Sequence, residues 1–536
     1  MTSTLGAEIS HCLKSKGVDI IFGIPGVHNQ ELYRGIEEAG IRHVLARHEQ
    51  GAGFMADGFA RVTGLPGVVY VISGPGVCNV MTPMGQAYSD SVPMLIIASG
   101  LDEESLEPGR GQLHEMKDQR AAAETVCDWA IIASDETEAY ELIDRAFLEF
   151  STKRKRPKYI QVPIPLLEKK IEKYTPKECY SELETQMADN RTPVSKINQL
   201  LESIFSETPK VLFIFGGGAS GCEESARRVF RRTSAACFST YSGRGVIRSD
   251  DPLNFGSYLA KRSSIDVISE AEIVIAVGTS LSEVDLWRDS LGVTGRFIWV
   301  NIDPEAFSDQ IGVHEKIVCD SEVFLNLLLK VVNTDLDPKW DKKLISKFRK
   351  KWENEADLER PGIVEICHAL RKAAPDNTTF FSDMTQFSYV GKEVIPMSLS
   401  NHWHHPYGFG TLGYALPAAI GGALGASGAP VIAIAGDYGF QYTVQELATA
   451  VELELGLPII LWDNGKLKEI EDSMRKAQIA PNAVIAKNPD FCKLAEAYGA
   501  LAVAPPDIKS FIVCVQDAFK QNKPTLIYIT EKILSK

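Results

Sequence analysis

The chain has 536 residues, which is too many for one hydrophobic core and favours about three domains. Its net charge of −14 at pH 7 argues against nucleic acid and anionic membrane surfaces as partners. Hydrophobic residues make up 45% and charged residues 24% of the chain, which are the proportions of an ordinary soluble globular enzyme.

The sequence shows no sign of export or of membrane insertion. The first residues, Met1–Glu8, lack a basic region followed by an apolar core, and no apolar stretch approaches the length of a membrane span. The ten cysteines include no Cys-x-x-Cys pair, which favours reduced thiols over a disulfide framework or a zinc site. We therefore expect a cytoplasmic protein with no membrane partner.

Short runs rich in Val and Ile alternate with helical stretches, a pattern typical of parallel α/β sheets. Near the N-terminus the landmarks are, in chain order, Ile20–Phe22 leading into Gly23-Ile24-Pro25-Gly26, then Arg47-His48-Glu49-Gln50-Gly51-Ala52, then Met55–Arg61, and a strand Val68–Ile72 ending in Ser73-Gly74-Pro75-Gly76. These strand and glycine patterns predict a first α/β domain.

The middle of the chain predicts a second α/β unit between two polar linkers, Tyr174–Arg191 and Asp335–Arg360. We expect the second linker to be partly helical, with its charges on a solvated face. The predicted strands of the unit are Val211–Phe215, Ile273–Val277 and Phe297–Val300. The turn Gly216-Gly217-Gly218 lacks the full Gly-x-Gly-x-x-Gly spacing, so it predicts no nucleotide site by itself. We expect an α/β fold of three domains with parallel sheets, over residues 1–175, 190–335 and 360–536.

Two strands near the C-terminus each end in a hard oxygen ligand. Pro430–Ala435 runs into Gly436-Asp437-Tyr438-Gly439, and Leu457–Trp462 runs into Asp463-Asn464-Gly465. Mg²⁺ takes few protein oxygens and shares the phosphate oxygens of its ligand, while glycines and a helix N-terminus let a backbone approach a phosphate. The pattern therefore indicates a site for magnesium and a diphosphate.

This last pattern resembles the thiamine diphosphate motif, Gly-Asp-Gly followed after a fixed interval by Asn-Asn. Tyr438 and Asp463 depart from it, whereas Asp437 and Asn464 keep its spacing. The N-terminal blocks and Gly408–Ala419 resemble the acetolactate synthase and 2-oxo acid decarboxylase superfamily over nearly the whole chain. The details of Gly111–Gln119, Leu281–Asp285 and Gly436–Gln441 look closest to its 5-guanidino-2-oxopentanoate (2-ketoarginine) decarboxylase branch.

The resemblance implies a pyrimidine-binding domain, a central domain and a diphosphate-binding domain, with thiamine diphosphate and Mg²⁺ as cofactors. It implies metal binding by Asp437, Asn464 and the backbone carbonyl of Lys466. Glu49 would hydrogen-bond the aminopyrimidine and so activate the cofactor. The remaining implied cofactor contacts are Thr385, Gln386, Gly410, Leu412, Gly436, Tyr438 and Gly439.

Proton transfer requires a further acid or base, and histidine suits this task because its ordinary pKa is near 6.5. By resemblance His28 lies beside the cofactor, and His114 lies in a loop where the synthases carry a Gln-Glu pair. We rank these two above His404 and His405, which precede the Leu412 block.

The leading functional hypothesis is decarboxylation of a small-molecule 2-oxo acid to an aldehyde and CO₂. A carboligase resembling acetolactate synthase is the alternative, and a scaffold without catalysis is a third hypothesis, motivated by Tyr438 and Asp463. The loop after Ile273–Val277 carries Glu283 and Asp285, which would suit a cationic substrate or would form a solvated acidic loop. By family precedent we expect a homodimer or homotetramer with its active sites between subunits.

Overall fold

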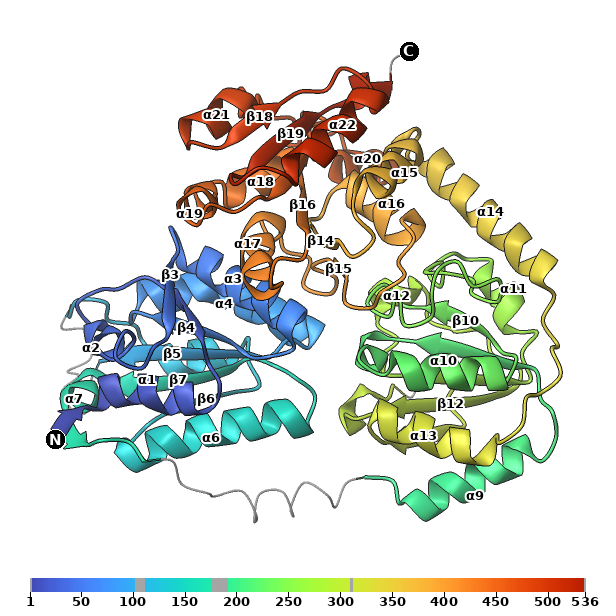
Figure 1. The fold of residues 1–536 in the computed structure, drawn as a ribbon, viewed down its shortest axis with the longest axis horizontal. Coiled ribbons are helices and arrows are strands. Elements are labelled where there is room, and N and C mark those ends of the chain that lie inside the picture. The colour runs from blue at the N-terminus through green and yellow to red at the C-terminus, as the bar shows by residue number, and fades with distance from the viewer. Residues whose placement is uncertain (1, 102–110, 176–190, 309–311, 535–536) are drawn as a thin grey trace. The chain divides into compact units, whose positions relative to one another are not determined.

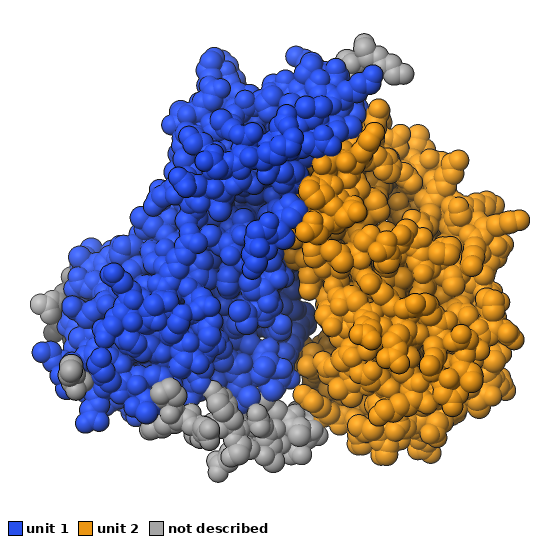
Figure 2. All heavy atoms as spheres, in the orientation of Figure 1, with its two compact units in different colours: residues 1–181, 380–385, 405–536 blue, residues 182–379, 386–404 orange. Residues whose placement is uncertain are grey.

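The computed structural model describes residues 2–101, 111–175, 191–308 and 312–534. The chain forms two compact units, which Figure 2 shows in different colours. The first unit comprises Met1–Ser181, Phe380–Thr385 and His405–Lys536, and the second comprises Glu182–Thr379 and Gln386–His404. Most of the predicted linker at 174–191 lies outside the described residues. No helix in the described ranges is both long enough and apolar enough to cross a membrane.

The N-terminal part of the first unit is built on a parallel six-stranded sheet (Figure 1). Its strands, in spatial order, are β3 (Arg42–Leu45), β2 (Ile20–Gly23), β4 (Gly67–Val71), β5 (Met94–Gly100), β7 (Lys158–Pro163) and β6 (Trp129–Ile132). Both faces are buried: Val68 and Tyr70 of β4 enter one hydrophobic cluster, and Val69 and Val71 enter another. This alternation is the period of two expected of a strand that is covered on both faces.

Helices connect and cover these strands. They are α1 (Leu5–Ser15), α2 (Gln30–Arg34), α3 (Glu49–Thr63), α4 (Pro75–Asp90), α5 (Gln119–Glu124), α6 (Glu136–Thr152) and α7 (Ile164–Glu168). Strands β1 (Thr2–Thr4) and β8 (Lys170–Glu172) form a separate antiparallel pair.

The C-terminal part of the same unit contains a second sheet with parallel strands. In spatial order it includes β14 (Thr379–Ser382), β16 (Val431–Gly436), β17 (Pro458–Trp462), β19 (Thr525–Ile529) and β18 (Leu501–Val503). Its helices are α17 (Ala415–Gly425), α18 (Asp437–Tyr442), α19 (Glu446–Glu452), α20 (Lys468–Lys476), α21 (Phe491–Ala497) and α22 (Ile508–Ala518).

Helix α3 of the N-terminal part packs directly on α17 of the C-terminal part (Figure 1). Glycines allow this close approach, because a Cβ on Gly58 would lie 1.9 Å from the Ala418 carbonyl oxygen and one on Gly421 would lie 1.8 Å from that of Met55. Residues of both helices belong to one buried hydrophobic cluster. The two parts of this unit therefore share a core, in which the middle of α3 packs against α17.

The second unit has a parallel five-stranded sheet in the order β10 (Ala236–Ser239), β9 (Val211–Phe215), β11 (Ile273–Val277), β12 (Arg296–Asn301) and β13 (Glu315–Val318). The predicted strands Val211–Phe215 and Ile273–Val277 are confirmed with the same bounds. Its helices are α9 (Val194–Phe205), α10 (Glu223–Arg232), α11 (Ser264–Ile268), α12 (Glu283–Leu286), α13 (Ser321–Val331), α14 (Lys342–Glu359), α15 (Ile363–Ala373) and α16 (Gln386–Val394). The short strand β15 (Trp403–His404) also belongs to this unit.

The segment 335–360 is more than a linker. Within it, α14 buries Ile345, Trp352 and Ala356. The Trp352 ring lies 5.8 Å from that of Phe238 and 6.0 Å from that of Phe255. The many charged residues of this segment indicated a solvated linker. Trp352 and Ala356, one helical turn apart, nevertheless form a buried apolar stripe.

Candidate functional site

The carboxyl ends of β16 and β17 bring Asp437 and Asp463 together in the first unit. Gly436 and Trp462 are paired in the register of the two strands, so the next residues leave the sheet at the same edge. The Asn488 amide Nδ2 donates to Asp437 Oδ2 at 2.7 Å and to Asp463 Oδ1 at 2.9 Å. Tyr528 donates its hydroxyl hydrogen to the other Asp463 oxygen at 2.8 Å.

This pair of carboxylates makes a site that favours a cation. Asp437 is buried, and desolvation together with the charge of Asp463 raises its pKa to about 6. A divalent cation between hard oxygen ligands would relieve that repulsion, so the residues present fit Mg²⁺. The two other predicted ligands, Asn464 and the Lys466 carbonyl, lie in one turn. This turn is closed by a hydrogen bond of 3.1 Å from the Lys466 N–H to Asn464 Oδ1.

A buried aspartate at the end of β14 connects the loops around this site. The Asp383 carboxylate accepts from the Met384 N–H at 2.8 Å and from the Gly413 N–H at 2.9 Å. Burial raises its pKa to about 6, against the backbone hydrogen bonds that lower it. A Cβ on Gly439 would lie 2.5 Å from Asp383 Oδ2. Glycine is therefore needed at 439, whereas the half-buried Tyr438 fits at the neighbouring position where the motif departs.

One predicted diphosphate contact, Thr385, lies beside the same turn. A Cβ on Gly436 would meet the Thr385 side chain at 3.1 Å, so the first of these loops lies directly against Thr385. Gln386 begins α16 in the second unit. Gly410 has a φ of 68°, a backbone conformation that favours glycine, and Leu412 is half-buried.

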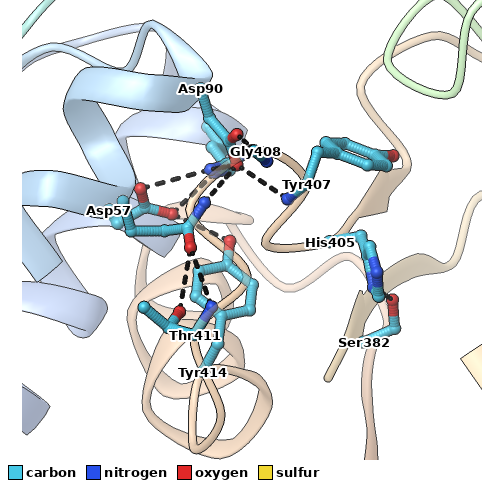
Figure 3. A network of polar contacts seen from close by, with 10 residues as sticks. Asp57, Asp90, Ser382, His405, Tyr407, Gly408, Thr411 and Tyr414 are labelled. Atoms are coloured by element: carbon cyan, nitrogen blue, oxygen red, sulfur yellow. Dashed lines mark hydrogen bonds and ion pairs between the residues drawn. The ribbon is translucent and has the colours of Figure 1, made fainter. Parts of the chain in front are cut away.

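The loop that carries Gly410 and Leu412 is tied to the N-terminal helices by a buried polar network (Figure 3). Arg61 forms ion pairs with Asp57 at 2.6 Å and Asp90 at 2.8 Å. Tyr414 donates to Asp57 at 2.8 Å, and Asp90 accepts from the Gly408 N–H at 3.2 Å. Figure 3 shows Asp57 and Asp90 facing Gly408, Thr411 and Tyr414 of the loop. The network fixes the loop without using the predicted cofactor contacts themselves.

Glu49 is the first residue of α3 and is buried. Its carboxylate accepts from the Asn79 amide Nδ2 at 2.9 Å. A Cβ on Gly76 would lie 3.4 Å from Glu49 Oε1, so α4 runs close beside this side chain. The predicted activating carboxylate is thus buried, and Asn79 is its one side-chain donor among the described residues.

His28 and His114 lie next to each other, as neighbouring imidazole rings whose centroids are 4.9 Å apart. His28 Nδ1 is 2.8 Å from Ser73 Oγ, and burial followed by the charge of His114 lowers the pKa of His28. Asn29 Oδ1 accepts from the Gly26 N–H at 2.7 Å and thereby shapes the turn that presents His28. His114 Nδ1 is buried without a hydrogen-bonding partner among the described residues.

His404, His405, Glu283 and Asp285 are the other candidates. His405 is buried, with Nδ1 3.0 Å from Ser382 Oγ, and His404 is buried in β15. Glu283 and Asp285 lie on α12 of the second unit, where Glu283 is exposed and Asp285 is half-buried. Asp285 accepts from Ser282 Oγ at 2.9 Å, and burial raises its pKa.

Sequence reasoning missed several polar residues around the site. Asn79, Asp383, Glu446 and Asn488 hold the predicted residues or the turns beside them. Asp383 had a signal, since it is an acidic residue directly after the short apolar run of β14. Asn488 had none, because its contacts to Asp437 and Asp463 join segments far apart in the chain.

Known proteins resemble this chain over most of its length. Family models for the thiamine pyrophosphate enzymes match three stretches: the N-terminal TPP binding domain at residues 3–122, the central domain at 197–328 and the C-terminal TPP binding domain at 383–529. A probable 2-ketoarginine decarboxylase of Pseudomonas aeruginosa is 38% identical over 98% of this chain and 94% of its own.

Acetolactate synthases are more distant relatives. The large subunit from Haemophilus influenzae is 28% identical over 95% of this chain and 91% of its own. The large subunit of isozyme 1 from Escherichia coli is 26% identical over 86% of this chain and 82% of its own.

The family identifies the cofactor as thiamine diphosphate, with Mg²⁺ as the metal that usually accompanies it, and small-molecule 2-oxo acids as the substrates. When bound, the cofactor stabilises the negative charge that develops on the former carbonyl carbon as CO₂ leaves. Three family domains match in order, and one relative matches nearly the full length at 38% identity. The protein is therefore an enzyme that belongs to the thiamine pyrophosphate enzyme family.

Proposed function

We propose that this enzyme decarboxylates a 2-oxo acid to an aldehyde and CO₂, with a cationic substrate such as 5-guanidino-2-oxopentanoate. The observation that carries the proposal is the similarity to the probable 2-ketoarginine decarboxylase over 98% of this chain. The test is a panel of cationic and neutral 2-oxo acids, read by CO₂ release and aldehyde formation. Highest kcat/KM for a guanidino or amino 2-oxo acid is the expected result, and a clear preference for pyruvate would contradict it.

We assign each site residue a role in binding the metal, binding the cofactor or transferring protons. Asp437, Asn464 and the Lys466 carbonyl hold Mg²⁺. Glu49 binds the aminopyrimidine, and His28 and His114 move protons to and from the reacting carbon. The remaining contacts to the cofactor are Thr385, Gln386, Gly410, Leu412 and the turn Gly436, Tyr438 and Gly439. The adjacency of His28 and His114 supports a shared proton relay, because a neighbouring ring and burial both favour the neutral form of His28.

Asp285 is the stronger of the two proposed substrate carboxylates. It is half-buried and oriented by Ser282, whereas Glu283 is exposed and solvated. A guanidinium group could replace part of the solvation that Asp285 has lost, because it donates two parallel hydrogen bonds to a carboxylate. Lys392, also in the second unit, contributes its positive charge near Asp285 and stacks 4.1 Å from the Tyr241 ring.

A carboligase remains the second candidate, favoured by the acetolactate synthase relatives at 26% and 28% identity. Both activities need the same cofactor contacts and differ in what captures the decarboxylated substrate. Incubation with pyruvate alone, and with pyruvate plus an acceptor aldehyde, distinguishes them. Free aldehyde supports the decarboxylase, and an acyloin or acetohydroxy acid product supports the carboligase.

We also propose that the active unit is a homodimer, paired into a homotetramer, with Glu49 of one chain acting with Asp437 of the other. The family precedent behind this proposal requires two chains for each site. Sedimentation of the active enzyme tests it, since an active monomer would refute it. A mixture of Glu49→Gln and Asp437→Ala chains should regain activity in mixed dimers, because one of their two sites is intact.

A further inference from the structure

A buried carboxylate on α19 is hydrogen-bonded to the backbone that leads into Glu49. The two oxygens of Glu446 accept from the Arg47 N–H at 3.1 and 3.2 Å, and Oε1 also accepts from the His48 N–H at 3.0 Å. Thr449 Oγ1 donates to Oε2 at 2.9 Å. The side chain of Glu446 has 0% exposure. The two amides before Glu49 therefore have one fixed, fully buried partner.

The same carboxylate fills the space beside Gly51, in the first turn of α3. A Cβ at this position would lie 2.2 Å from Glu446 Oε1 and 2.4 Å from its Cδ. Gly51 does not have a positive φ, so its backbone conformation does not call for glycine. The position needs glycine because Glu446, held by its hydrogen bonds, occupies the space of a side chain.

Burying this carboxylate has a cost that an apolar residue would avoid. Burial raises the pKa of Glu446 to about 7, although the N–H groups of Arg47 and His48 and the Thr449 hydroxyl lower it. The position at the start of α3 reduces that cost, since the N-terminus of a helix favours a negative charge. In return, the hydrogen-bonded carboxylate fixes the backbone at the residue before Glu49.

We propose that Glu446 is a positioning residue for Glu49: its carboxylate fixes the Arg47–His48 backbone and thereby aims the Glu49 side chain. Within the part of the chain that the structure describes, the Glu49 carboxylate accepts a hydrogen bond only from the Asn79 amide, so its direction also depends on where its own backbone is held. The inference rests on the proposed role of Glu49 as the activating carboxylate. It adds a contact from the C-terminal part of the chain that neither the metal nor the diphosphate requires.

The first experiment measures the backbone directly, in the protein without cofactor. Hydrogen–deuterium exchange of the peptide containing Arg47 and His48 should be faster in Glu446→Ala than in the parent. It should remain slow in Glu446→Gln, because a glutamine oxygen can accept from both N–H groups while its amide donates to Thr449. Parental exchange in Glu446→Ala, or equally fast exchange in Glu446→Gln, would overturn the proposal.

The second experiment separates positioning from binding in the holoenzyme. Glu446→Ala should lower kcat about 100-fold, because a misplaced catalytic group is costly, and should leave the dissociation constant of thiamine diphosphate within about threefold. Glu446→Gln should restore kcat to within about threefold of the parent, since it keeps the hydrogen bonds. A loss in Glu446→Gln as large as in Glu446→Ala would overturn the proposal and assign the effect to charge.

In the Gly51→Ala variant Glu446 is still present, but its carboxylate is pushed away from the Arg47 and His48 amides. The new Cβ should break the Arg47 and His48 contacts, so exchange and kcat should change as in Glu446→Ala. In the double variant Gly51→Ala/Glu446→Ala the losses should not add, because one contact cannot be lost twice. Additive losses would overturn the proposal. If Glu446→Ala alone does not fold, Gly51→Ala gives the same measurements, and parental exchange there would be equally decisive against it.

Glu452→Gln is the matched control. Glu452 lies on the same helix and pairs with the Arg47 guanidinium, but it does not bind the backbone N–H groups, so this variant should keep parental exchange and kcat. Glu49→Gln is measured alongside. If Glu49→Gln keeps parental turnover, the role proposed for Glu49 fails; if it is inactive while Glu446→Ala is parental in exchange and kcat, only the positioning role fails.

Discussion

The side-chain amide of Asn79 donates a hydrogen bond of 2.9 Å to the carboxylate of Glu49. Asn79 lies in α4, and Glu49 begins α3, so the contact joins two helices that follow different strands of one sheet. A donor to a carboxylate fixes the direction of its oxygens. The pair therefore sets the orientation of the side chain that we propose activates the cofactor.

Replacing each member of this pair should have different consequences. Glu49→Gln should reduce turnover about 10²- to 10⁴-fold, because a neutral amide cannot share a proton with the aminopyrimidine. Its fold and its affinity for the diphosphate should be almost unchanged. Asn79→Ala should cost only about tenfold, the value of one hydrogen bond to a charged group. Steady-state kinetics and cofactor titration check both, and a Glu49→Gln rate within a few-fold of the parent would contradict the assignment.

Asp437→Ala should abolish retention of thiamine diphosphate. Without this carboxylate the diphosphate loses the cation that bridges it to the protein. Calorimetric titration of the metal-stripped variant, with Mg²⁺ then restored, measures the effect. Tyr442→Phe is a suitable control, since Tyr442 ends the same helix and is half-exposed. Cofactor binding of parental strength in Asp437→Ala would show that the metal is held elsewhere.

The two residues that follow Asp437 should respond in opposite ways. Tyr438→Gly restores the usual motif and should keep cofactor affinity within about threefold, because Tyr438 is only half-buried and its loss disturbs no core packing. Gly439→Ala should weaken cofactor binding at least about tenfold, since its Cβ would lie 2.5 Å from Asp383 and would shift the turn. The reverse ranking of the two dissociation constants would refute this account of the turn.

A buried ion pair between β7 and α6 predicts an acid-dependent stability. Lys158 Nζ lies 2.9 Å from Glu149 and 2.6 Å from Asp128. Burial would raise the pKa of Glu149, but the hydrogen bond and charge of Lys158 outweigh it and lower the pKa from 4.5 to about 2. The unfolded chain therefore takes up this proton first, so the stabilisation is present above about pH 4.5 and is lost as the pH falls towards 2.

Glu149→Gln should remove that part of the pH dependence. Lys158→Met should lower the free energy of unfolding by about 2 kcal/mol at pH 7, because it removes a charged hydrogen bond at the buried carboxylate, while Arg145 and Lys153 remain paired with Glu149. Chemical denaturation between pH 3 and 7 measures both, with the exposed pair Lys520–Asp517 as a control through Lys520→Met. If the free energy of unfolding of Glu149→Gln falls with pH as steeply as that of the parent, other carboxylates cause the acid dependence.

Strands, glycine turns and their order could be predicted from the sequence because they depend on local patterns. The strand Leu457–Trp462 is found as β17, Pro458–Trp462, and Asp437 and Asn464 follow their strands as expected. The adjacency of His28 and His114 was not predicted, although each residue was, since it depends on how two loops meet at one sheet edge.

Partners that come from distant segments could not be predicted. Glu446 lies in an ordinary amphipathic helix, and nothing near it in the sequence indicates that its carboxylate reaches Arg47 and His48. Gly51 indicated that some group lies close to the start of α3, because no turn requires a glycine there, but it did not indicate which residue supplies that group. The apolar stripe of α14 was similarly obscured by its many lysines, so its burial of Trp352 became visible only once the helix was packed.

Asp285 and Glu283 give the sharpest test of substrate choice, because they are neighbours on α12 in different environments. Asp285→Asn keeps the shape and the Ser282 contact but removes the charge, so kcat/KM for a guanidino 2-oxo acid should fall about 10- to 100-fold. The value for pyruvate should change less than about threefold, and Glu283→Gln, at the exposed position, should affect both substrates little.

The pH dependence of that preference adds an internal check. Burial lowers the pKa of Lys392 to about 8, against the charges of Glu393 and Asp285, which raise it. As the pH rises through about 8, Lys392 loses the positive charge that competes for Asp285, so the preference for the cationic substrate should increase. In Asp285→Asn this increase should disappear. Equal losses for both substrates in Asp285→Asn, or a preference that is flat across this pH range in the parent, would contradict recognition by Asp285 and favour the carboligase.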